Sequence, residues 1–202
     1  MIGPVYVVTD PVAPLSVAAQ ARAAARGGAW AVQIRDKTAS DSEIARSAEE
    51  LMAELSPLGV RVFVNDRVEV ARATTADLHI GQGDGDPRRA RARITAHALL
   101  GLSVETAAQC AAIPEGVAYV GAGPFRATAT KSDAATPIGA SGLAGIVAVA
   151  GVPVIAIGGL SRADVPALKR AGAAGMAVVS AVSRAPDPQA ATRSLVEAWR
   201  QA

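Results

Sequence analysis

The sequence predicts a single-domain (β/α)8 barrel, the α/β fold also known as the TIM barrel. Short runs of β-branched residues alternate with alanine-rich stretches of helical length along almost the whole chain, which is typical of βαβ units around a parallel sheet. Eight such runs fit into 202 residues, near the lower size limit of this barrel. An open doubly wound sheet is the alternative, but it normally stops at about five to seven strands.

The expected strands are short and rich in valine, isoleucine and leucine. In chain order they are Val5–Thr9, Ala31–Ile34, Val62–Val64, Leu78–Ile80, Leu99–Leu102, Ala118–Val120, Val154–Ile157 and Gly175–Val178. Helices are expected between them, several after a capping residue such as Ser40 or Ser161. They include Leu15–Ala25, Asp41–Leu55, Glu105–Ala111, Ser141–Ala150, Asp164–Ala171 and Gln189–Arg200. No linker or low-complexity segment interrupts the pattern, so residues 1–202 are expected to form one catalytic domain.

The composition argues against several classes of protein. Hydrophobic residues make up 50% of the chain and the mean hydropathy is +0.28, yet no stretch approaches the roughly 18 apolar residues of a membrane span. The first residues carry no basic region and no apolar leader, so a cytoplasmic location is expected. A net charge of +2 and an aromatic content of 3% argue against nucleic-acid binding. The arginine cluster of Arg88–Arg93 is therefore interpreted as a solvated helix face. The sequence leaves open whether the protein forms a homo-oligomer.

Polar side chains gather where the expected strands end, and in this fold the C-terminal ends of the strands carry the chemistry. The second strand ends in the run Gln33-Ile34-Arg35-Asp36-Lys37. Because side chains alternate along a strand, Gln33, Arg35 and Lys37 point to the same side. Two cations and an amide that converge there suit an oxyanion. Salt bridges at the rim of the barrel are the alternative.

Two carboxylates follow the next two strands. Asn65 and Asp66 end the third strand, and Asp84 lies just beyond the fourth. Magnesium takes one or two protein carboxylates and completes its shell with water and substrate phosphates, so Asp66 and Asp84 predict a Mg²⁺ site beside the cations. Helix capping or plain surface exposure of these acids is the alternative. His79, inside the fourth strand, is interpreted as a buried structural histidine and not as a catalyst.

The remaining strands end in small and hydroxylated residues. Ser103 ends the fifth strand, and the loop after the sixth contains Thr128-Ala129-Thr130-Lys131. That loop offers two hydroxyls and an ammonium to a phosphate or a ring, and an ordinary surface loop is the alternative. The pairs Gly158-Gly159 and Val179-Ser180 follow the seventh and eighth strands, where loops of this fold often bind phosphate through backbone N–H groups.

These motifs, in this order, resemble those of the thiamine phosphate synthase family, also called thiamine-phosphate pyrophosphorylase. The matching segments span essentially the whole chain and are Val5-Tyr6-Val7-Val8-Thr9-Asp10, Val32-Gln33-Ile34-Arg35-Asp36-Lys37, Val64-Asn65-Asp66-Arg67, His79-Ile80-Gly81-Gln82-Gly83-Asp84, Gly101-Leu102-Ser103, Gly121-Ala122-Gly123-Pro124, Thr128-Ala129-Thr130-Lys131 and Ala156-Ile157-Gly158-Gly159. Each segment is short, but eight of them in sequence are difficult to obtain by chance.

The resemblance implies an enzyme that condenses 4-amino-2-methyl-5-hydroxymethylpyrimidine diphosphate with 4-methyl-5-(2-phosphoethyl)thiazole, or its carboxylated form. The products are thiamine phosphate and diphosphate. By resemblance the pyrimidine diphosphate site consists of Gln33, Ile34, Arg35, Asp36, Lys37, Asn65, Ser103 and Lys131, with Asp66 and Asp84 as Mg²⁺ ligands. The thiazole phosphate site consists of Thr128, Ala129, Thr130, Gly159, Val179 and Ser180. The expected catalytic residues are Arg35, Ser103 and Lys131. Ser103 is similar to the serine that contacts the pyrimidine amine or the diphosphate.

The chain also departs from the family, and other functions compete. The family more often has an aromatic residue and a proline before Thr-x-Thr-Lys, where this chain has Arg126 and Ala127, and Gly83 replaces a common glutamate. Thiazole tautomerase, an isomerase on the same barrel that needs an acid/base residue and no magnesium, usually lacks the Thr-x-Thr-Lys loop. A non-catalytic binder of phosphorylated ligands is the third hypothesis. The sequence shows no nucleophile with a paired base, and the synthase reaction needs none.

Overall fold

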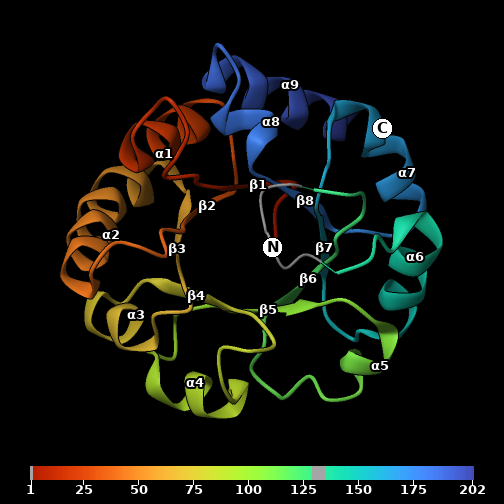
Figure 1. Cartoon of the computed structure of the whole chain (residues 1–202), viewed down its shortest axis with the longest axis horizontal. Helices are drawn as coiled ribbons and strands as arrows, with labels where there is room; N and C mark the ends of the chain where they lie inside the picture. The colour runs from red at the N-terminus through yellow and green to blue at the C-terminus, as the bar shows by residue number, and fades with distance from the viewer. Residues whose placement is uncertain (1, 129–134) are drawn as a thin grey trace.

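The computed structural model describes residues 2–128 and 135–202, and within these ranges eight parallel strands close into a barrel (Figure 1). The strands are β1 (Val5–Val8), β2 (Ala31–Ile34), β3 (Arg61–Asn65), β4 (Asp77–Ile80), β5 (Leu100–Val104), β6 (Tyr119–Ala122), β7 (Val154–Ile157) and β8 (Gly175–Val178). Each strand pairs with the next along the chain, and β8 returns to β1, where Val5 lies opposite Met176. The predicted fold class is confirmed, and each strand ends within two residues of its expected bounds.

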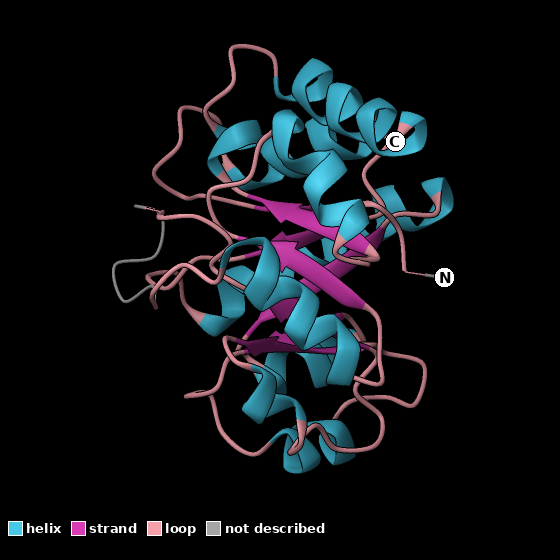
Figure 2. Ribbon diagram, turned by 90° about the vertical axis from the view of Figure 1, so that its right-hand side faces the viewer, coloured by secondary structure: helices cyan, strands magenta, loops and turns pink. Residues whose placement is uncertain are grey.

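Helices surround the barrel, as the side view in Figure 2 shows. They are α1 (Val17–Arg26), α2 (Asp41–Leu55), α3 (Val68–Thr74), α4 (Pro87–Arg93), α5 (Ala107–Cys110), α6 (Gly139–Val149), α7 (Val165–Arg170), α8 (Ser180–Ser183) and α9 (Pro188–Gln201), with short 3-10 helices η1 (Ser56–Leu58) and η2 (Arg162–Asp164). α3 and α8 were not among the expected helices, and α4 was expected only as the helix that carries the arginine cluster. The arginine cluster forms α4, and Arg88, Arg89 and Arg93 are exposed there, which confirms its interpretation as a solvated helix face.

Both serines that were expected to cap helices do so. The Ser40 hydroxyl accepts a hydrogen bond from Glu43 N, while the Glu43 carboxylate accepts one from Ser40 N, and α2 begins directly afterwards. Ser161 forms the same reciprocal pair with Asp164, but it opens η2, one turn before α7. Among the helices described, none combines the length and the apolar character that a membrane crossing needs.

The strands are apolar on both faces because the barrel has an inner and an outer core. On β1, Val5 and Val7 pack outward against the helices, whereas Tyr6 points into the barrel. Inside, the rings of Tyr6, Trp30, Phe63 and Tyr119 contact one another pairwise, with centroids 5.1 to 6.2 Å apart. This aromatic cluster fills the barrel below its C-terminal rim and forms the floor of the cavity described next.

Candidate active site

A cavity of about 500 Å³ opens at the C-terminal ends of the strands. Residues from several strand ends that the sequence analysis selected line it together: Gln33, Arg35, Lys37, Asn65, Asp84, Ser103, Thr128, Gly159, Val179 and Ser180. Aromatic side chains of the barrel interior, Tyr6 and Tyr119, close it from below. The topology therefore brings residues from β2 through β8 to one place, as expected for this fold.

Other selected residues lie elsewhere. The Ile34 side chain is 1% exposed and packs outward in the layer between barrel and helices, so only its backbone faces the rim. Asp36 turns away and accepts hydrogen bonds from Thr38 N at 2.8 Å and Ala39 N at 3.1 Å, which holds the loop before α2. The segment Ala129-Thr130-Lys131 lies outside the described residues.

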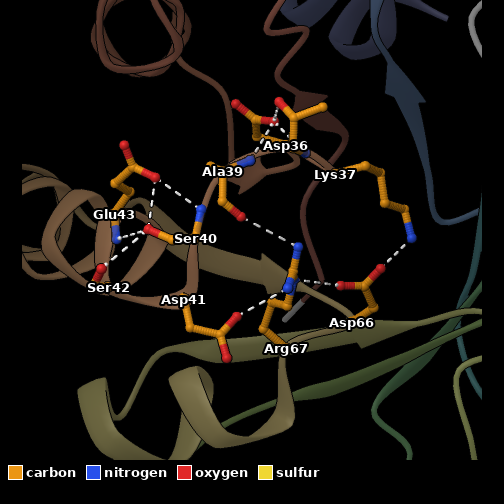
Figure 3. A network of polar contacts seen from close by, with 10 residues as sticks. Asp36, Lys37, Ala39, Ser40, Asp41, Ser42, Glu43, Asp66 and Arg67 are labelled. Carbon is orange, nitrogen blue, oxygen red and sulfur yellow. Dashed lines mark hydrogen bonds and ion pairs between the residues drawn. The ribbon is translucent and has the colours of Figure 1, made fainter.

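The two cations that follow β2, Lys37 and Arg35, differ in their acidic partners. Lys37 forms an ion pair with Asp66, which also lies 3.2 Å from the Arg67 guanidinium, and Arg67 reaches on to Asp41 at 2.9 Å (Figure 3). Arg35 faces the cavity, and in residues 2–128 and 135–202 no carboxylate pairs with it. A buried or half-buried guanidinium without an acid is a ready partner for an incoming phosphate.

The two candidate metal ligands occupy neighbouring loops. Asp66 adopts a left-handed backbone conformation with φ of 51°, which aspartate tolerates better than most residues, and its N–H donates to the His79 carbonyl at 2.9 Å. Asp84 folds back so that one carboxylate oxygen accepts from Gly81 N at 2.7 Å. In the described part of the chain no group of three or more His, Cys, Asp or Glu residues forms a metal cage. Asp84 lines the cavity, whereas Asp66 is not among its lining residues and is held by Lys37 and Arg67.

A chain of hydrogen bonds crosses the floor of the cavity. The Ser103 hydroxyl lies 3.0 Å from His79 Nε2, and His79 Nδ1 lies 2.8 Å from the Tyr119 hydroxyl. Tyr119 in turn bonds to Tyr6 at 3.3 Å, and Gln33 donates to Tyr6 at 2.8 Å. We call these five residues the floor network. It fixes the side chains of Gln33 and Ser103, both of which line the cavity.

The pairing of Ser103 with His79 corrects the expectation that no hydroxyl has a base beside it. The pair still lacks what a hydrolytic nucleophile needs. Burial, against a weaker opposite effect of Asp84, lowers the pKa of His79 to about 4, so at neutral pH its imidazole holds a proton poorly. Its other nitrogen contacts the neutral Tyr119, whose pKa burial raises, in place of a carboxylate. Both ring nitrogens of His79 have hydrogen-bond partners, as expected of a structural histidine, but the residue is half-buried and lines the cavity.

Glycines shape the opposite side of the cavity. Gly158 and Gly159 follow β7 with φ of 101° and 63°. The loop after β6 lies directly on them, because a Cβ on Gly158 would approach Pro124 Cα to 2.6 Å, and one on Gly159 would approach the Ala127 carbonyl to 2.7 Å. Only glycine permits this contact, which lets backbone groups line the cavity next to Thr128.

The sequence analysis missed Tyr6 and Tyr119 as parts of the site. Both lie in apolar strands and both are buried, at 2% and 0% exposure, so their pattern predicts core alone. The available signal was the phenolic hydroxyl, which requires a hydrogen-bond partner when a tyrosine is buried. Tyr119 lies directly opposite Gly101 on β5 and two positions before Gly121 on β6, which indicates a polar group next to the small residues of the barrel interior.

Comparison with known proteins places this cavity in context. A family model described as thiamine monophosphate synthase matches residues 5–182. The chain belongs to this family. A thiamine-phosphate synthase of Xanthobacter autotrophicus is 46% identical, over 94% of this chain and 92% of the relative, and one of Chloroflexus aurantiacus is 45% identical, over 94% and 89%. The structure of thiamine phosphate pyrophosphorylase from Pyrococcus furiosus superposes with a TM-score of 0.88 at 32% identity, covering 98% of this chain and 96% of that one.

Proposed function

We propose that the protein is a thiamine phosphate synthase. It condenses 4-amino-2-methyl-5-hydroxymethylpyrimidine diphosphate with 4-methyl-5-(2-phosphoethyl)thiazole, or its carboxylated form, and releases thiamine phosphate and diphosphate. Family membership supports the reaction. The observation that carries it is that one cavity mouth holds a cationic side, with Arg35 and Lys37, and a glycine-lined side, with Gly158 and Gly159. Such a mouth fits two phosphorylated substrates side by side.

The chemistry needs positioning and charge stabilisation more than a nucleophile. The bond between the pyrimidine methylene carbon and the diphosphate oxygen breaks, and its electron pair leaves with the diphosphate. The aminopyrimidine ring stabilises the resulting cation, and the thiazole nitrogen then donates its lone pair to form the new C–N bond. Arg35 and Lys37 stabilise the charge that accumulates on the departing diphosphate, and the two sides of the mouth align the rings.

Magnesium would be held by Asp66 and Asp84, and when bound it supplies further neutralisation of the diphosphate charge. Lys37 pairs with Asp66 in this structure. When substrate and metal bind, Lys37 would exchange this carboxylate for a phosphate, and Asp66 would exchange the ammonium for the metal. Lys131, outside the described residues, is proposed as a third cation, and Ser103 as a substrate contact fixed by the floor network.

A tautomerase would need a general acid or base near neutral pKa. His79 is the only imidazole among the described residues that line the cavity, and burial lowers its pKa, which disfavours it as a general acid at neutral pH. No observation favours that function or a non-catalytic binder over the synthase.

The deciding assay mixes the purified protein with both substrates and Mg²⁺ and measures thiamine phosphate and diphosphate. Product should appear only when both substrates are present, and EDTA should abolish it. Arg35→Ala should lower kcat by about 10² to 10³-fold, as removal of one donor to developing charge does. Arg88→Ala, which removes the same charge from the exposed face of α4, should retain wild-type rates. Absence of product with active substrates would overturn the proposal.

A further inference from the structure

Arg126, one of the residues that depart from the family pattern, joins two loops of the rim. Its guanidinium donates to one oxygen of Asp164, from Nε at 2.9 Å and from Nη2 at 2.6 Å. Arg126 follows β6, whereas Asp164 ends η2 after β7. The ion pair therefore spans the loops on the glycine-lined side of the cavity.

Asp164 is a fixed anchor for this pair. Its side chain is 3% exposed, and its second oxygen accepts hydrogen bonds from Ser161 N at 2.9 Å and from the Ser161 hydroxyl at 3.0 Å. Arg126 is 61% exposed, but it also lies over the buried Phe125 ring, 5.6 Å from the centroid. A buried carboxylate with all partners in place holds its geometry, so the arginine is the part that adapts.

The backbone beside Arg126 continues the same connection. Phe125 N donates to the Ile157 carbonyl at 2.7 Å, and Arg126 N donates to the Gly158 carbonyl at 3.0 Å. Two residues later in the loop, Thr128 lines the cavity, as does Gly159. Side chain and backbone together thus fasten the segment 125–128 onto the glycine pair.

We propose that Arg126 is a positioning residue that sets the affinity of the glycine-lined side for its phosphate-bearing ligand by holding segment 125–128 against Gly158 and Gly159. The proposal rests on the proposed function for the identity of that ligand, the thiazole phosphate. Arg126 acts through Asp164 and not by touching the phosphate. A guanidinium whose Nε and Nη2 both face one carboxylate oxygen has that edge committed to the protein.

The test compares Arg126→Ala, Asp164→Asn and the double variant with wild type. Each single variant should raise the KM for the thiazole phosphate about tenfold, leave the KM for the pyrimidine diphosphate within about twofold, and leave kcat largely intact. The double variant should be no worse than either single one, because both changes break one connection. Arg162→Ala, which removes an exposed charge from the same loop as Asp164, is the matched control and should leave both KM values unchanged.

Two readouts separate this proposal from its rivals. If Arg126 bound the phosphate directly, Asp164→Asn would free the guanidinium and leave or lower the KM for the thiazole phosphate, which would overturn the positioning role. Amide hydrogen exchange needs no turnover. The N–H groups of Phe125 and Arg126 should exchange faster in Arg126→Ala and in Asp164→Asn than in wild type. Unchanged exchange would refute the connection itself, even if the protein catalysed a different reaction.

Discussion

Gly101→Ala should damage the floor network from inside the barrel. A Cβ at this position would lie 2.3 Å from Tyr119 Cζ, 2.4 Å from its hydroxyl oxygen and 2.6 Å from His79 Nδ1. All three distances are far below contact distance, and the obstacles are the Tyr119 phenol and the His79 ring in a packed interior. Overpacking of this kind costs about 1–3 kcal/mol. Displacing Tyr119 also breaks its bond to His79, and a buried polar group left without a partner costs about 1–3 kcal/mol more.

The expected loss is therefore roughly 2–6 kcal/mol of unfolding free energy, measured as a lower denaturant midpoint at unchanged m-value. Gly121→Ala is the matched control: it lies on the neighbouring strand, and its Cβ would meet His79 Cε1 at 3.3 Å. A small shift relieves that contact, and the added side chain restricts the unfolded chain, so its net effect should stay within about 1 kcal/mol. If Gly101→Ala lost no more than Gly121→Ala, the rigidity assigned to Tyr119 and His79 would be refuted.

Other substitutions have equally definite outcomes. Arg61→Met should lower the unfolding free energy by about 3 kcal/mol, because it leaves the buried Asp77 without its cation. Burial already raises the pKa of Asp77, so the loss of stability relative to wild type should grow as the pH rises from about 4. Equal shifts of the denaturant midpoint at pH 4 and pH 8 would contradict this. Asp84→Asn should raise the Mg²⁺ concentration for half-maximal turnover at least about tenfold. Asp86→Asn, at the α4 N-cap, should leave that concentration unchanged, and an equal increase in both variants would mean that Asp84 does not bind the metal. Ser40→Ala should lose about 1 kcal/mol in thermal unfolding through its cap of α2, and no loss would show that η1 and the barrel hold that helix without the cap.

The strands of the barrel were predictable from local pattern, whereas the short helices α3 and α8 were not. β2, β7 and β8 have the same bounds in the structure as the sequence predicts. α3 and α8 have only 7 and 4 residues, too few for a helical period to emerge, and α8 packs against α1 and α9. Their existence depends on the closed barrel and not on propensity.

In the candidate site, too, the features set by local pattern were predictable and those set by contacts between distant segments were not. Gln33, Arg35 and Lys37 could be placed on one side by strand alternation, which is a local rule, and they do line one cavity. Asp36, between Arg35 and Lys37, points away from the cavity, and its carboxylate accepts a hydrogen bond from Thr38 N. The pairing of Ser103 with His79 joins different strands, and Arg126 with Asp164 joins different loops, so no spacing along the chain encodes them. The roles of all these residues in catalysis stay predictions.

The aromatic cluster gives the protein two separate optical reporters. Trp30 contacts Tyr6, Phe63 and Tyr119 inside the barrel, whereas Trp199, the other of the chain's two tryptophans, lies on α9 with the Lys169 ammonium 5.3 Å from its ring. Replacing either one by phenylalanine leaves a fluorophore that sees only the inner or only the outer core. Loosening of the helical shell before the barrel opens would appear as two transitions in the two variants, and a single cooperative unit would give one shared midpoint.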